Sequence, residues 1–122
     1  MAPIVGRIRR QATFRALARP DGRAQRGPVS VVFSRSDENT HLPLAAYAVG
    51  RRHGGAVARN RLRRRLREAV RTAAPTLEPG AYLVRARPDA ARMGFGELCD
   101  AVGAAARAAA GCATGERGQG PR

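Results

Sequence analysis

The chain has 122 residues, 23 of them basic and 9 acidic, and its formal net charge is +14. This length suits one domain that buries an ordinary core without metal or disulfide staples. No apolar run approaches the roughly 18 residues that span a bilayer, and the segment Met1–Arg10 lacks the apolar stretch and cleavage site of a secretion signal. We therefore expect a cytoplasmic protein with a strongly anionic partner.

Arginine supplies every basic residue, and lysine is absent. The planar guanidinium group suits phosphate and can stack on bases, so this usage fits contact with RNA or DNA. Codon bias in a GC-rich genome explains the usage equally well, and we give that explanation more weight.

The first half of the chain indicates one helix and two strands. Residues Arg9–Ala18 carry Phe14 and Leu17 three positions apart, as on one face of a short helix. The segment Val29–Phe33 is rich in β-branched residues and predicts a strand. Residues Leu44–Val49 predict a second strand, and we expect the two strands to pair antiparallel.

The second half indicates two longer helices with a strand between them. A glycine pair at residues 54–55 precedes an arginine-rich helix, which ends before Pro75. Residues Ala81–Ala86 predict the next strand, and a last helix runs from about Phe95 to Ala110. This order of elements predicts an α+β fold, with a short, mostly antiparallel sheet covered by helices.

We expect three regions along the chain. Residues 1–8 form a flexible basic N-terminus, and residues 9–110 form a single domain. Residues 111–122 are rich in glycine and have little to bury, so they predict a disordered tail.

The segment Arg59–Arg71 holds seven arginines in thirteen positions. Its apolar neighbours are spaced as a stripe on one side of a 3.6-residue helix. They are Ala58, Leu62, Leu66, Ala69 and Val70. Because like charges one turn apart repel, this helix requires a polyanion on its outer surface. A solvated surface helix is the alternative interpretation, but such helices mix both signs of charge, and here only Glu68 is acidic.

Candidate catalytic groups are scarce. Neither His41 nor His53 has a nearby Ser, Cys or carboxylate in a recognised arrangement. The acidic residues are scattered, so no carboxylate cluster stands out that could hold catalytic metal ions. Cys99 and Cys112 are too few for a zinc site. We expect the chain to act by binding and positioning, with no catalytic residue and no metal ligand of its own.

The stretch Val49–Glu68 joins two basic residues at the end of a strand to a glycine and then to A-V-A-R-N-R at the start of the basic helix. It closely resembles the protein component of bacterial ribonuclease P. The matching residues are Arg51, Arg52, Gly54, Ala56, Val57, Arg59, Asn60 and Arg61. A weaker resemblance extends from about Arg9 to Ala109.

This resemblance implies a small α/β sandwich in which the basic helix connects two parallel strands by a left-handed crossover, against the usual right-handed rule. It also implies an accessory subunit of ribonuclease P, an endoribonuclease. The implied partners are its catalytic RNA and precursor tRNA, from which the holoenzyme removes the 5′ leader. Cleavage is expected to be a Mg²⁺-dependent hydrolysis performed at the RNA, with Mg²⁺ held mainly by RNA and substrate.

The family's roles place the basic turn and helix against the catalytic RNA. These RNA-binding positions are Arg51, Arg52, Arg59, Asn60, Arg61, Arg63, Arg64, Arg65 and Arg67. Asn60 has a second interpretation, as a residue at the helix start that satisfies local backbone groups. Phe14 and Phe33 match aromatic residues that line the family's leader cleft, where stacking tolerates any base. Each of the two is equally well explained as a core residue.

Some positions depart from the family's pattern. Gly50, His53 and Gly55 replace the usual residues of the turn, which predicts a looser or differently capped start of the helix. Ala18 stands where many relatives have an aromatic residue. Arg85 replaces a commonly apolar strand residue, which predicts an exposed strand face.

Two other classes of function fit the charge. A basic RNA-binding protein without a role in catalysis, such as a ribosomal component, is the first. A DNA-binding module is the second, but arginines spread around the helix leave no small set of side chains to read base edges.

Overall fold

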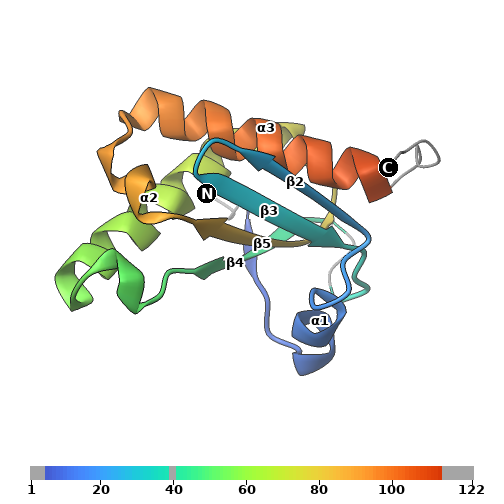
Figure 1. Ribbon diagram of the computed structural model, residues 1–122. Coiled ribbons are helices and arrows are strands. Elements are labelled where there is room, and N and C mark those ends of the chain that lie inside the picture. Colours follow the sequence, from blue (N-terminus) through green and yellow to red (C-terminus); the bar gives the residue numbers. More distant parts are fainter. Residues whose placement is uncertain (1–4, 39–40, 114–122) are drawn as a thin grey trace.

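The computed structural model describes residues 5–38 and 41–113 (Figure 1). The α-helices and strands within these residues are β1 (Gly6–Arg7), α1 (Gln11–Ala16), β2 (Gly22–Arg26), β3 (Val29–Ser34), β4 (Pro43–Ala48), α2 (Ala56–Ala73), β5 (Gly80–Ala86) and α3 (Phe95–Ala113). Short 3₁₀ helices lie between them, namely η1 (Arg51–His53), η2 (Ala74–Thr76) and η3 (Pro88–Arg92).

The strands form one sheet in the order β1-β4-β5-β3-β2. Strand β4 pairs parallel with both β1 and β5, whereas β3 pairs antiparallel with β5 and β2. The basic helix α2 therefore connects two adjacent parallel strands, as the resemblance implies. The left hand of that connection stays a prediction.

Helices α2 and α3 cover one face of the sheet, and α1 lies at the opposite face (Figure 1). The main core lies between the sheet and the two long helices. Its largest members come from all of these elements. They include Val31 and Phe33 of β3, Tyr82 and Val84 of β5, Leu66 and Val70 of α2, and Leu98 and Val102 of α3. The predicted α+β fold with a helix-covered sheet is confirmed, but the sheet is not mostly antiparallel as predicted, because two of its four strand pairings are parallel.

A smaller cluster anchors α1 and the start of the chain on the other face. It consists of Ile8, Leu17, Leu44 and Ala81. Ile8 is buried and Gly6–Arg7 pairs with β4, so residues 5–8 belong to the domain. The prediction that they form part of a flexible N-terminus is wrong. Residues 1–4 lie outside the described residues.

Helix α3 is built mostly from alanine and glycine, and small side chains let it approach the sheet closely. A Cβ added at Gly22 of β2 would lie 2.0 Å from the carbonyl oxygen of Ala109. The helix also continues through Ala113, so the predicted domain end at residue 110 and tail start at residue 111 are wrong by three residues. The rest of the predicted tail, residues 114–122, lies outside the described residues.

The strand pairing predicted from sequence is also wrong. Strand β3 does not pair with β4; its neighbours are β2 and β5. The sequence reading missed β2 because Gly22–Arg26 is polar, as suits an edge strand with one side open to solvent. With β2 in place, β3 and β2 form a hairpin around Gly27, whose φ is +58°.

Candidate nucleic-acid interface

Helix α2 docks through a narrow apolar stripe. Its buried residues are Leu62, Leu66, Ala69, Val70 and Ala73. Ala58, which the spacing also placed on this stripe, is exposed, because the helix has only begun at Ala56 and its first turn projects beyond the core. Of the other thirteen residues of the helix, seven are arginines.

One flank carries an arginine every fourth residue, at Arg59, Arg63, Arg67 and Arg71, a spacing that aligns side chains along one side of a helix. The Arg67 guanidinium carbon lies 5.8 Å from the centre of the Tyr47 ring on β4, so this flank faces the β4 side of the sheet. Burial raises the pKa of Tyr47 to about 12 despite the opposing charge of Arg67. The phenol is therefore neutral at physiological pH.

The other flank holds Arg65, which serves the fold. Its guanidinium donates hydrogen bonds to the carbonyl oxygens of Ala91 (3.3 Å) and Met93 (2.5 Å). These bonds tie α2 to η3 and to the residue that follows it. Arg65 is thus less available to RNA than its predicted role requires.

The outermost arginines have no protein partner in the described part of the chain. Arg51, Arg52, Arg61 and Arg64 are all exposed, and none forms a side-chain hydrogen bond or ion pair there. Nη1 of Arg71 pairs with the Glu68 carboxylate at 3.1 Å. Arg61 and Arg64 lie on α2, whereas Arg51 and Arg52 lie on η1 before it. Unpaired guanidinium groups at these positions are suited to the phosphates of a nucleic-acid backbone.

Two further predicted residues lie at the start of this surface. Asn60 is exposed, and its Oδ1 accepts a hydrogen bond of 2.9 Å from Nη1 of Arg63. Its side chain therefore orients a neighbouring arginine and does not cap the helix, whose N-cap residue Gly55 has no side-chain cap. Nε of Arg59 is buried without a hydrogen-bond partner among the described residues.

The turn into α2 is fixed by His53 in η1. Its Nδ1 lies 3.1 Å from the carbonyl oxygen of Gly50, and its Nε2 lies 2.6 Å from that of Ala86 at the end of β5. Gly54 follows with a φ of +108°, which favours glycine. The turn is not loose, because the imidazole fastens it to the sheet; a cap that differs from the family's stays a prediction.

A groove separates α2 from α1 along the β1 edge of the sheet. Its volume is about 580 Å³. The residues that line it include Arg7, Phe14, Tyr47, Arg67 and Arg71. The Phe14 side chain is 45 % exposed, so it is a candidate stacking platform beside three guanidinium groups.

Phe33 does not reach this groove, and its predicted place in the leader cleft is wrong. It is only 1 % exposed and packs on Tyr82 with ring centres 4.9 Å apart. The reason is the alternation of β3, which turns Phe33 to the same helix-covered face as Val29 and Val31. Glycine at position 80 makes room, since a Cβ there would lie 2.4 Å from the Phe33 ring.

The opposite face of the sheet is partly open and carries two more arginines. Arg85 of β5 is exposed, as predicted from its unusual place on a strand. Arg85 pairs with Ser30 of β3. Two residues further along β3, Val32 pairs with Arg23 of β2. The sequence did not single out Arg23, because the polar segment Gly22–Arg26 gives no clear strand signal.

Among residues 5–38 and 41–113, no three His, Cys, Asp or Glu side chains come together as metal ligands. Over the same residues, no helix is both long and apolar enough to cross a membrane. The fold and its surface define a class: a basic α+β domain whose arginine-rich helix connects two adjacent parallel strands and carries unpaired guanidinium groups on its outer surface.

Comparison with known proteins narrows this class. The sequence profile of the family Ribonuclease P matches residues 4–110. The Ribonuclease P protein component of Acidothermus cellulolyticus is 40 % identical over 99 residues, which cover 80 % of this chain and 82 % of that protein. That of Streptomyces griseus is 37 % identical over 114 residues, covering 86 % and 92 %. The chain belongs to the family of ribonuclease P protein components, the protein subunit of an endoribonuclease that processes tRNA 5′ ends.

Solved structures agree on the fold. The RNase P protein from Thermotoga maritima superposes with a TM-score of 0.66 at 22 % identity, covering 79 % of this chain and 90 % of that one. The Staphylococcus aureus RNase P protein gives a TM-score of 0.62 at 20 % identity, covering 86 % and 93 %.

Proposed function

We propose that this chain binds the catalytic RNA of ribonuclease P through α2 and the turn before it, and binds the 5′ leader of precursor tRNA in the neighbouring groove. The holoenzyme then removes the leader by endonucleolytic hydrolysis, with the chemistry performed at the RNA. The observation that carries this proposal is the set of unpaired guanidinium groups on η1 and on the docked helix α2, in a chain of this family.

The arginines divide by their contacts. Those without a described protein partner are the first choice for phosphates of the catalytic RNA, and they are Arg51, Arg52, Arg61 and Arg64. Arg59, Arg63 and Arg67 border the same surface on the flank that faces β4, and Asn60 orients Arg63. Arg65 first holds α2 to the segment around η3.

The groove beside Phe14 suits a single-stranded leader. It combines an exposed ring with Arg7, Arg67 and Arg71, so bases can stack while phosphates pair with guanidinium groups. Neither kind of contact reads a base sequence. That property suits a subunit whose substrates carry many different leaders.

The described residues do not form a magnesium site by themselves. The described residues bring no cluster of three carboxylate, His or Cys ligands together, and the candidate surface carries positively charged arginine side chains, which repel a metal ion. We assign Mg²⁺ to the RNA subunit and the substrate. Because its partners are RNAs, we place the protein in the cytoplasm.

Equilibrium binding tests the proposal against its alternatives. The full chain should bind its cognate catalytic RNA more tightly than a DNA duplex of equal length at the same salt concentration. A ribosomal component would instead sediment with ribosomes in a salt-resistant way and have no effect on leader removal. Preference for the DNA duplex, or stable ribosome association alone, contradicts the proposal.

A further inference from the structure

Helix α1, which carries Phe14, has no side-chain cap from its own N-cap residue. It has only six residues, from Gln11 to Ala16, and its N-cap Arg10 makes no side-chain cap. An α-helix leaves its first N–H groups without intrahelical partners, and a helix this short is marginal by itself. Its placement therefore depends on contacts from elsewhere in the chain.

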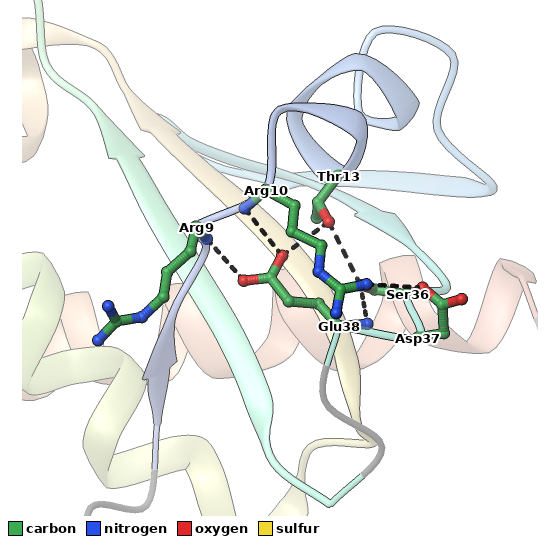
Figure 2. Close-up of polar contacts among 6 residues, drawn as sticks. All are labelled: Arg9, Arg10, Thr13, Ser36, Asp37 and Glu38. Carbon is green, nitrogen blue, oxygen red and sulfur yellow. Dashed lines mark hydrogen bonds and ion pairs between the residues drawn. The ribbon is translucent and has the colours of Figure 1, made fainter.

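Those contacts come from Glu38, which follows β3 in the sequence (Figure 2). Its Oε2 accepts a hydrogen bond from the backbone N–H of Arg9 at 2.6 Å. Its Oε1 accepts one from the backbone N–H of Arg10 at 3.2 Å and one from the Thr13 hydroxyl at 2.8 Å. A carboxylate more than twenty residues away thus does the work of a helix cap.

The carboxylate is itself held in place. The backbone N–H of Glu38 donates to Oγ of Ser36 at 3.1 Å. Burial raises the pKa of the Glu38 carboxyl group, but the hydrogen bonds from Thr13, Arg9 and Arg10, together with the charge of Arg10, outweigh this effect and lower it below its ordinary value. The group is consequently ionised at neutral pH, which strengthens all three bonds.

The other end of α1 is fastened by two contacts. The Ser34 hydroxyl donates to the carbonyl oxygen of Ala16 at 3.1 Å. The Leu17 side chain is 4 % exposed in the small cluster under the sheet. At the opposite end, the buried Ile8 anchors the chain before α1, and Glu38 supplies the hydrogen bonds to Arg9, Arg10 and Thr13. Phe14 lies between the two ends and lines the groove.

We propose that Glu38 is a positioning residue for the 5′ leader: it fixes the N-terminus of α1 and so holds Phe14 at the groove wall. This inference rests on the proposed function of the groove. It assigns Glu38 no contact with RNA, since its two oxygens are directed to Thr13 of α1 and to Arg9 and Arg10 just before the helix (Figure 2).

Glu38→Gln tests the inference with little change of shape. The carboxylate accepts hydrogen bonds with both oxygens, whereas an amide has one oxygen acceptor and one NH₂ donor. In the variant the NH₂ group would face donors at one of the two positions. Asp37→Asn is the matched control, because it removes the same charge one residue away. Asp37 is exposed, and within the described part of the chain its carboxylate pairs with the Arg10 guanidinium alone, at 3.6 Å. Thr13→Val removes one of the three bonds and is the milder second variant.

Two measurements separate this inference from the proposed function. In the free protein, Glu38→Gln should increase amide hydrogen exchange over residues 11–17 and leave α2 unchanged. In the reconstituted holoenzyme, it should weaken the affinity for precursor tRNA with a long leader by about three- to tenfold, as loss of a helix cap predicts. The affinity for a substrate with a one-nucleotide leader, and kcat at saturation, should match those of Asp37→Asn.

The inference is overturned if amide exchange in α1 does not change, or if both substrates are weakened equally. A holoenzyme whose affinity for the long leader is the same with Glu38→Gln and Asp37→Asn also overturns it. Failure of the wild-type chain to restore cleavage refutes the proposed function instead, and the exchange measurement still decides whether Glu38 fixes α1.

Discussion

The guanidinium group of Arg67 lies over the ring of Tyr47, 5.8 Å from its centre, and joins the basic helix to the strand beside the groove. Arg67 belongs to the α2 flank that faces β4, and both residues line the groove that holds Phe14. The surface proposed for the catalytic RNA and the groove proposed for the leader therefore meet at this pair.

The tyrosines give a pH prediction. Burial raises the pKa of Tyr47 to about 12, and burial with the nearby Glu78 carboxylate raises that of Tyr82. The pKa of each tyrosine is thus higher in the folded protein than in the unfolded chain. The free energy of unfolding therefore keeps its full value below about pH 10 and falls as the pH rises toward 12. With two tyrosines and no tryptophan, the ultraviolet titration is easy to read. A phenolate transition near pH 10 in the folded protein would contradict the burial.

The two phenylalanines should behave differently. Phe33→Ala should lower the free energy of unfolding by about 3–5 kcal/mol, because it empties a packed core position. Phe14→Ala should leave stability almost unchanged and weaken leader affinity by about 1–3 kcal/mol, the contribution of one stacked base. Chemical denaturation and substrate binding measure both effects. Equal loss of stability in the two variants would show that Phe14 is a core residue after all.

The arginines of α2 should also separate. Arg61→Ala should weaken binding to the catalytic RNA and reduce the salt slope by roughly one unit, as expected for a lost phosphate contact. Arg65→Ala should mainly lower the melting temperature, since it loses hydrogen bonds to Ala91 and Met93. Binding titrations over a range of salt, with a thermal melt of each variant, test the pair. An unchanged slope for Arg61→Ala means that this residue points away from the RNA.

Close packing of α3 on β2 gives a prediction about stability. Gly22→Ala places a Cβ 2.0 Å from the Ala109 carbonyl oxygen, so the helix must shift, at a cost of about 1–3 kcal/mol. Gly96→Ala at the other end of α3 is the control, because no atom lies within 4 Å of the added Cβ. That variant should be neutral or stabilised by up to about 1 kcal/mol. Denaturation midpoints that fall equally would contradict the packing.

Much of the fold was accessible from sequence because its signals are local. The spacing of Leu62, Leu66 and Val70 predicted which side of α2 is buried. The strand β2 was not predictable in this way, since its residues are polar and its pairing depends on the helix α3 that covers it. Sheet order likewise depends on a crossover between distant strands, which no local pattern records.

The sequence predicted which residues belong to the candidate site better than it predicted their contacts. The motif located the arginines, but it could not show that Arg65 is bound to backbone carbonyls or that His53 fastens the turn. Phe33 was misplaced, although its alternation with Val29 and Val31 was a usable sign that all three share the buried face. The Glu38 clamp on α1 joins residues too far apart in the chain for any spacing rule to connect.

Reconstituted cleavage tests the central claim most directly. The full chain is mixed with its cognate catalytic RNA and a precursor tRNA at low magnesium, and the 5′ ends of the product are mapped. We expect no cleavage by the protein alone, strong stimulation of the RNA, and release of the leader at the mature 5′ end. No stimulation at any magnesium or salt concentration would contradict the account.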